Sequence, residues 1–105
     1  MGSVKAYMPD KVEQTAHLSS VFDALRSPVR LRILELVRGT KRPLHIKAVA
    51  KALQMDYAAI YRHISILEKV GLVQIFEVGR SRVLSTMHDE ALNQLFALAE
   101  KIKVE

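Results

Sequence analysis

The sequence contains no cysteine, which excludes disulfides, thiolate metal sites and thiol nucleophiles together. Long apolar runs are also missing, because none approaches the roughly 18 to 20 residues that a membrane-spanning helix needs. The Met1-Gly2-Ser3 start lacks the charged and then apolar layout of a signal peptide. We therefore expect a cytoplasmic protein with no membrane partner, stabilised by packing or by a partner subunit.

Signatures of catalysis are equally scarce. No nucleophile and base stand at a recognisable spacing, and no glycine-rich loop could cradle a phosphate. Asp89 and Glu90 stand together, but in the first turn of an expected helix, where acidic side chains stabilise the helix dipole. The histidines are scattered along the chain, at His17, His45, His63 and His88. No second histidine in the last helix completes a metal site with His88 and Asp89, so we expect no enzyme, no cofactor and no metal.

The chain does have an excess of basic residues, and they are concentrated in its middle. Sixteen Lys and Arg against eleven Asp and Glu give a formal net charge of +5. Residues 41–82 carry eight basic and three acidic side chains, whereas residues 83–105 carry two and four. A basic segment favours a polyanionic partner such as nucleic acid, with a uniformly solvated charged surface as the alternative.

The apolar periodicity predicts one domain over residues 10–105, after a disordered N-terminus over residues 1–9. Helical spacing predicts helices over 10–26, 28–38, 44–54, 56–70 and 87–103. A run of β-branched and aromatic residues interrupted by Gly79 predicts a β-hairpin over 72–86. The expected fold class is therefore mainly α with a small hairpin between the fourth and fifth helices.

Local signals place the ends of these helices. Ser27-Pro28 is a strong start signal, since serine caps a helix and proline is tolerated at its first position. Gly39 and Gly71 are expected to end the second and fourth helices, and Asp56 to cap the fourth. Thr86, three residues before Asp89, is expected to mark the start of the last helix.

The helix over 28–38 is expected to be an amphipathic core helix. Its apolar stripe consists of Val29, Ile33, Leu34 and Val37. Three arginines fall largely outside this stripe and are expected to be solvated, namely Arg30, Arg32 and Arg38.

The helices over 44–54 and 56–70 are joined so tightly that they predict a helix-turn-helix. On the second of them the apolar positions are Ile60, Ile64 and Leu67. The opposite face then carries Tyr57, Ala58, Tyr61, Arg62 and Ser65. Small residues permit close approach, and phenols and a guanidinium can bind phosphates or base edges, so this face suits a DNA major groove about 12 Å wide.

The predicted hairpin tip adds Arg80 and Arg82 beside Gly79, which suits contact with the DNA backbone or the minor groove. A plain solvated turn is the alternative. Lys47 and Lys51 are weaker phosphate candidates, as are Lys41, Arg42 and Lys69. For His63 we expect packing or a phosphate contact.

Three segments resemble the ArsR-type winged-helix regulators. The segments are Phe22–Val37, which resembles their entry motif, Tyr61–Val73, which resembles their recognition helix, and Val78–Arg80, which resembles their wing. The resemblance implies a winged helix-turn-helix that acts as a homodimer on an inverted-repeat operator, paired through its first and last helices. The interface residues expected on those helices are Val12, Leu18, Val21, Phe22, Leu92, Leu95, Phe96, Ala99 and Ile102.

The departures from this family also carry information. His45 and Lys47 stand where metal-sensing members carry a Cys-x-Cys pair, which excludes soft-metal thiolate sensing at that position. Tyr61, Ala58 and Ala59 replace the family's usual serine, proline and threonine, so an operator sequence is not transferable from relatives. The favoured hypothesis is a dimeric regulator of transcription, a repressor, that binds double-stranded DNA. The alternative is a winged-helix module that docks onto another protein without an operator.

Overall fold

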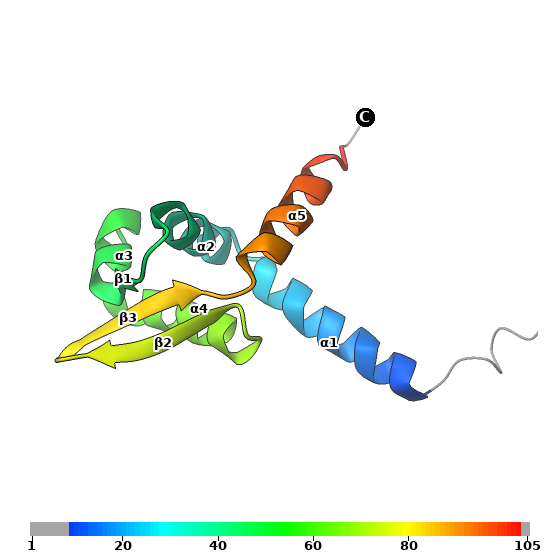
Figure 1. The fold of residues 1–105 in the computed structure, drawn as a ribbon, viewed down its shortest axis with the longest axis horizontal. Coiled ribbons are helices and arrows are strands. Elements are labelled where there is room, and N and C mark those ends of the chain that lie inside the picture. The colour runs from blue at the N-terminus through cyan, green and yellow to red at the C-terminus, as the bar shows by residue number, and fades with distance from the viewer. Residues whose placement is uncertain (1–8, 104–105) are drawn as a thin grey trace, which may run out of the picture.

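The computed structural model describes residues 9–103, which form five helices and a three-stranded sheet within that part of the chain (Figure 1). In chain order the elements are α1 (Pro9–Leu25), α2 (Pro28–Thr40), β1 (Leu44–His45), α3 (Ile46–Leu53), α4 (Tyr57–Lys69), β2 (Val73–Val78), β3 (Ser81–Thr86) and α5 (Asp89–Glu100). The mainly helical fold with a hairpin is confirmed. The expected disorder of the N-terminus concerns residues 1–8, which lie outside the described residues, whereas Pro9 already belongs to α1.

The core lies where α2, α3 and α4 meet one face of the sheet. Its fully buried large side chains are Ile33, Leu34, Ile46, Val49, Ile60, Ile64, Leu67 and Leu84. Those on α3 and α4 stand at three- and four-residue steps, as expected for helices with one apolar face, whereas Ile33 and Leu34 are neighbours on α2 and Leu84 lies on β3. Burial of this set orients α3 and α4 relative to each other, and their outer faces are left exposed.

Helix α2 begins as the sequence predicts but ends later. The Ser27 hydroxyl accepts a hydrogen bond from the Arg30 amide at 3.3 Å, and Pro28 occupies the first turn. Gly39 was expected to end the helix, but it lies within α2, which continues to Thr40. The left-handed residue is Lys41, with φ of 56°, so a non-glycine residue provides the helix end.

A third strand precedes α3, where the sequence predicted a helix from residue 44. Leu44 and His45 form β1 and pair antiparallel with Leu84 and Val83 of β3. The strand order is therefore β1-β3-β2, and α3 itself is one short helix over residues 46–53. Because β1 joins the sheet, it fixes the start of α3 beside the hairpin.

The hairpin pairs β2 with β3 in a register that runs from Val73 opposite Thr86 to Val78 opposite Ser81. Only Gly79 and Arg80 remain in the turn, and Gly79 has φ of +62°. Glycine at the first position of a two-residue turn is typical of a type II′ hairpin. The turn therefore places Arg80 at the tip.

Helix α5 starts two residues later than the predicted residue 87. Its first residue is Asp89, and His88 precedes it in a left-handed conformation with φ of 58°. Thr86 was expected to mark this start, but it closes β3 instead. The helix also ends at Glu100, earlier than the predicted 103, because residues 101–103 are not helical.

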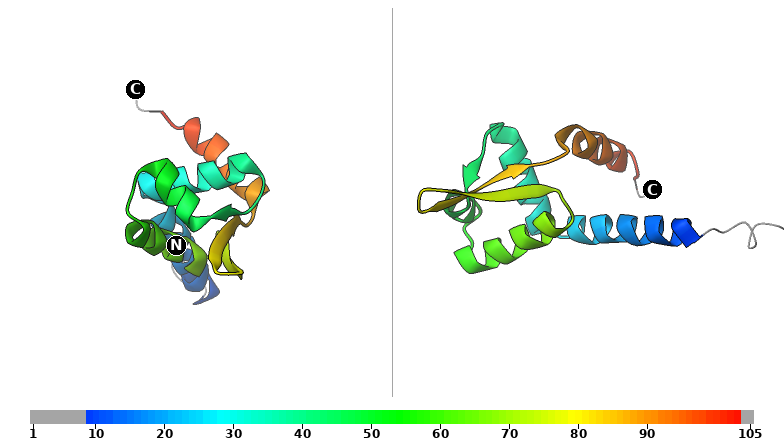
Figure 2. Two further views of the ribbon diagram at one scale, coloured as in Figure 1. Left: turned by 90° about the vertical axis from the view of Figure 1, so that its left-hand side faces the viewer. Right: turned by 60° about the horizontal axis from the view of Figure 1, so that its bottom comes forward.

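Helices α1 and α5 project from the body on the side opposite the hairpin tip (Figure 1), and the right-hand view of Figure 2 shows the same separation. Several large apolar side chains on them are exposed, namely Val12, Leu18, Phe22 and Leu98, as is Ile102 just beyond α5. These residues include several of those that the sequence predicted for a dimer interface.

Two glycines provide a matched test of the helix ends. Gly71 follows α4 with φ of +81°, and a Cβ there would meet no atom within 4 Å. Gly71→Ala should therefore lower the free energy of unfolding by about 1 kcal/mol, through backbone strain alone. Gly39 is equally unobstructed but helical, so Gly39→Ala should raise it by about 0.5 kcal/mol. Urea denaturation measures both, and equal effects of the two substitutions would contradict this description.

Candidate nucleic-acid interface

Helix α4 presents the outer face that the sequence predicted. Asp56 caps it, its carboxylate accepting from the Ala59 amide at 3.4 Å. The apolar residues of the opposite face are fully buried, so the helix has one rotational setting. Ala58 and Arg62 are exposed as a result, and Tyr61 and Ser65 are partly exposed. Tyr57 is also exposed, at the first residue of the helix.

Two tyrosines of α4 and one arginine of the hairpin form a stack. The rings of Tyr57 and Tyr61 lie 6.1 Å apart between centroids, inclined by 24°. The Arg82 guanidinium lies over the Tyr61 ring, 5.1 Å from its centroid, and 3.9 Å from the Glu77 carboxylate. A cation over an aromatic face is attracted by the ring quadrupole. The stack therefore joins the hairpin to α4 while the Arg82 side chain stays 46% exposed.

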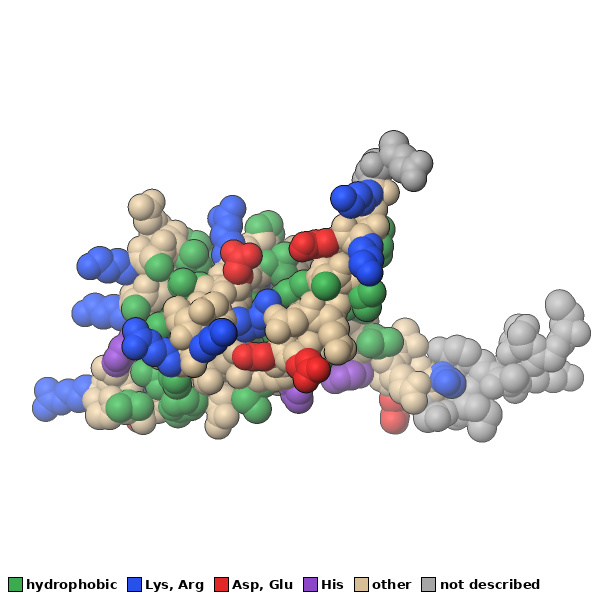
Figure 3. All heavy atoms as spheres, turned by 45° about the horizontal axis from the view of Figure 1, so that its top comes forward, with side chains coloured by type: hydrophobic (Ala, Val, Ile, Leu, Met, Phe, Trp, Pro, Cys, Tyr) green, Lys and Arg blue, Asp and Glu red, His purple; other side chains and the backbone are tan. Residues whose placement is uncertain are grey.

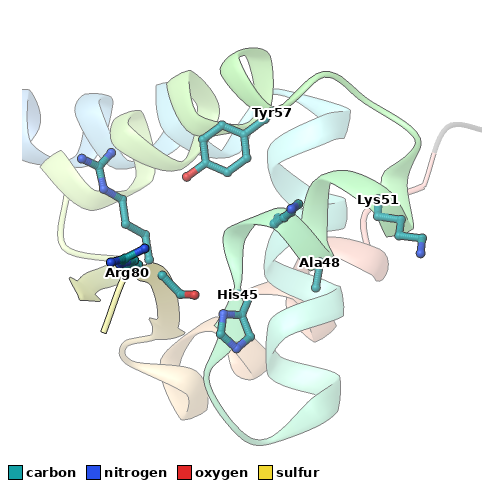
Figure 4. Close-up of a pocket in the computed structure, with 8 residues that line it drawn as sticks. His45, Ala48, Lys51, Tyr57 and Arg80 are labelled. Carbon is teal, nitrogen blue, oxygen red and sulfur yellow. The ribbon is translucent and has the colours of Figure 1, made fainter. Parts of the chain in front are cut away.

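A groove of about 750 Å³ lies between α3, the start of α4 and the hairpin. It is lined by His45, Lys47, Ala48, Lys51, Tyr57, Arg80, Ser81 and Arg82. Figure 4 shows His45, Lys51, Tyr57 and Arg80 arranged around this hollow. Basic side chains project from the end of the molecule that carries α3 and the hairpin tip (Figure 3). The lining holds four Lys or Arg residues and no acidic residue, so it suits a polyanion.

The structure brings most of the predicted DNA-contacting residues to this end of the molecule. Lys47 and Lys51 lie one turn apart on α3 and line the groove together with Arg80 and Arg82. Ser65 is less available than expected, because its hydroxyl donates to the Tyr61 carbonyl at 2.9 Å. Only its oxygen lone pairs remain for another partner.

His63 has a different environment from the other predicted contact residues. Its Nδ1 lies 3.1 Å from Nη1 of Arg30, and the ring is partly buried. Burial, together with the positive charges of Arg30 and Arg62, lowers the pKa of His63 below its ordinary 6.5. The packing part of the sequence expectation therefore fits the structure.

Arg30 was expected to be solvated, and this expectation is wrong. Arg30 is 6% exposed and donates from Nε to the Ala24 carbonyl at 2.6 Å and from Nη2 to the Asp23 carbonyl at 3.2 Å. Arg38 is also partly buried, with its guanidinium 4.9 Å from the centroid of Phe96. Arg30 therefore buries its guanidinium as well as its stem. Nε and Nη1 of Arg38 are also buried, and neither has a hydrogen-bond partner among the described residues.

The residues expected at a dimer interface differ in how far they are exposed. Val12, Leu18 and Phe22 on α1 are more than half exposed, as is Ile102 beyond α5. Val21, Leu95 and Phe96 are partly buried against the core, and Ala99 is exposed. The expectation that Leu92 lies at the interface is wrong, because Leu92 is 2% exposed and belongs to the core of its own chain.

Sequence analysis missed three contributors to the groove, namely His45, Ala48 and Ser81. Ala48 could have been found, because it lies between Lys47 and Lys51 on the exposed face of a short helix. His45 could not, since its position depends on the pairing of β1 with β3.

Two further properties concern residues 9–103 only. None of the helices there combines the length and the hydropathy required to cross a membrane. Over the same residues, no three His, Asp or Glu side chains gather in a group that could hold a metal ion.

The fold and this basic face define a winged helix-turn-helix domain, in which α3 and α4 are the helix-turn-helix and β2–β3 is the wing. The model of the family described as HVO_A0114 matches residues 25–91, well over half of the chain. The HTH-type transcriptional regulator NmtR of Mycobacterium tuberculosis is 34% identical over 83 residues, which are 79% of this chain and 67% of NmtR.

Solved structures agree with this assignment. NolR from Sinorhizobium fredii is 26% identical, with a TM-score of 0.74 over 94% of this chain and 97% of its own. An ArsR-like transcriptional regulator from Rhodococcus sp. RHA1 is 30% identical, with a TM-score of 0.64 over 84% of this chain and 81% of its own. The homodimeric winged helix-turn-helix DNA-binding domain Mb0332 from Mycobacterium bovis has the same fold, with a TM-score of 0.76 at 24% identity. The match covers 90% of this chain and 85% of that domain. The chain belongs to the ArsR family of winged helix-turn-helix transcriptional regulators.

Proposed function

We propose that this protein is a repressor of transcription that binds an inverted-repeat operator as a homodimer. The observation that carries the proposal is the groove between α3, α4 and the hairpin, whose lining is basic on both sides. In this arrangement α4 enters the major groove with Tyr57, Tyr61 and Arg62 towards the bases. Lys47, Lys51, Arg80 and Arg82 bind phosphates on either side of α4.

A second copy of the chain supplies the other half of the operator. The exposed apolar residues of α1, with those at the end of α5, lie on the side opposite the hairpin tip (Figure 1). Pairing there leaves the basic groove of each subunit open. A two-fold dimer places its recognition helices on half-sites roughly 10 base pairs apart or a multiple of that, which requires a symmetric operator. Soft-metal thiolate sensing plays no part, because the chain has no cysteine.

The proposal is tested by selecting duplexes from a random pool and measuring the affinity of the winner by fluorescence anisotropy. Enrichment of an inverted repeat is expected, whereas failure to enrich any sequence favours a protein-docking module without an operator. Repression is tested separately, with the selected site placed over a reporter promoter. Increased transcription in the presence of the protein would contradict a repressor while leaving DNA binding intact.

Arg62 provides the sharpest single-residue test of base recognition. It is exposed on the outer face of α4, so Arg62→Ala should weaken binding to the selected duplex by about 1–3 kcal/mol. The matched control is Arg32→Ala, which removes the same charge from an exposed position on α2, outside the lining of the groove and outside the proposed dimer interface. Equal losses for the two variants would show that only net charge matters.

A further inference from the structure

Among the described residues, Arg30 is a buried cation whose contacts join three helices. Arg30 lies in the first turn of α2 and donates to the carbonyls of Asp23 and Ala24, which lie in the last turn of α1. A helix leaves its final carbonyls without the usual amide partner four residues later. The Asp23 carbonyl also accepts from the Arg26 amide at 3.4 Å, just beyond the helix. The remaining nitrogen, Nη1, lies 3.1 Å from Nδ1 of His63 on α4. A single guanidinium therefore connects the end of α1 to the middle of α4.

The chemistry of this contact determines where the proton on His63 lies. A guanidinium only donates hydrogen bonds, so Nδ1 of His63 must accept and must carry no hydrogen. The neutral ring then carries its proton on Nε2. Protonation of Nδ1 would replace the acceptor with a second donor facing Arg30, so the contact exists only while the imidazole is neutral.

The other charges near this pair cannot substitute for the contact. On α4, Arg62 adds a second positive charge beside His63. On α1, the carboxylate of Asp23 is occupied by Arg26 at 2.8 Å. His17 and Lys69 line the hollow between α1 and α4 together with Asp23. Burial and the two arginines disfavour a positive charge on His63. No carboxylate among the described residues forms an ion pair with His63.

We propose that Arg30 and His63 position the recognition helix α4 relative to α1, and that tight DNA binding requires the neutral form of His63. The inference rests on the proposed function, since it assigns α4 to the major groove and α1 to the dimer interface. In this role His63 does not touch DNA. It acts through Arg30, which holds α4 at the angle that the two-fold operator demands.

A direct contact between His63 and a DNA phosphate predicts the opposite dependence of affinity on pH. If the imidazole of His63 bound a phosphate, protonation would strengthen binding, and affinity would rise as the pH falls. If it positions α4 through Arg30, protonation removes the contact, and affinity falls relative to a variant that keeps an acceptor at this position.

The test compares the full-length protein with His63→Asn, because the Asn Oδ1 takes the place of Nδ1 but does not titrate. At pH 7.5 the two should bind the selected duplex about equally. One pH unit below the pKa of His63, the unmodified protein should bind roughly a hundredfold more weakly than His63→Asn, because only about a tenth of the imidazoles remain neutral in each of the two subunits of the dimer. His45, which lines the DNA groove, is present in both proteins and cancels in the ratio. A ratio that stays constant with pH, or moves the other way, overturns the proposal.

Two readouts separate this proposal from the proposed function. Long-range ¹H–¹⁵N spectra of the free protein at pH 7.5 should show Nδ1 of His63 bare and Nε2 protonated, and a proton on Nδ1 would overturn the contact. His63→Leu, which has no acceptor, should bind DNA roughly tenfold more weakly than His63→Asn at the same pH. Equal affinities for these variants would overturn the positioning role alone. If the expected tautomer is seen and no variant binds any duplex, the proposed function fails and the positioning role fails with it.

Discussion

Replacing Phe22 with aspartate should convert the protein from a dimer to a monomer and weaken its binding to an inverted repeat by about 10²- to 10⁴-fold. Phe22 is 53% exposed on α1 and is not one of the residues that pack against the core of its own chain. A carboxylate there leaves the folded subunit intact, because the position is solvated, but it cannot be buried against a second apolar surface. The loss is large because two linked half-sites gain affinity from their effective concentration.

Analytical ultracentrifugation measures the first part of this prediction and anisotropy the second. The matched control is Val78→Asp, since Val78 is similarly exposed, at 58%, but lies at the hairpin tip. That variant should remain a dimer. A Phe22→Asp protein that sediments as a dimer would show that α1 does not form the interface.

The second large effect concerns the hairpin arginines. Replacing Arg80 and Arg82 with alanine should lower the affinity for any duplex by several hundredfold, roughly fivefold for each of the four arginines in a dimer at about 0.15 M salt. Each phosphate contact releases about 0.9 of a counterion, so the dependence of affinity on salt should become shallower by about the same amount per arginine.

The two arginines differ in one respect that single variants can detect. Arg80 is exposed at the tip and has only its charge to contribute. Arg82 also lies over the Tyr61 ring, so Arg82→Ala should additionally alter the discrimination between the selected and a scrambled duplex. If Arg80→Ala and Arg82→Ala change affinity and discrimination equally, the stack has no part in recognition.

The sequence predicted the outer face of α4 well because that face follows from periodicity. Ile60, Ile64 and Leu67 stand at four- and three-residue steps, and all three are fully buried. Once they define the packed side, Ala58 and Arg62 can only point outward.

The buried position of Arg30 was missed although the spacing contained it. Arg30 precedes Ile33, Leu34 and Val37 by three, four and seven residues, so it lies on the same stripe of α2. A charged residue was assigned to solvent by its type rather than by its position. Its acceptors are carbonyls of α1 and a ring nitrogen of α4, and these could be known only from the tertiary structure.

Other details could not be predicted because they depend on backbone conformations that residue type does not favour. Lys41, Gln54 and His88 all adopt left-handed conformations, and the first two end helices where glycine would be the usual choice. β1 is only two residues long and exists because β3 offers it a partner. The groove depends on this pairing, since β1 places α3 beside the hairpin.

The most direct test of the central claim, that the basic face of this protein binds duplex DNA, is the affinity of the unmodified protein for its selected duplex as the salt concentration increases. The groove, with Lys47, Lys51, Arg80 and Arg82 in each subunit, predicts a linear fall of the logarithm of the binding constant with the logarithm of the salt concentration. Its slope should be about −0.9 for each phosphate contacted. Binding that does not change with salt, or no binding at low salt, would contradict the account.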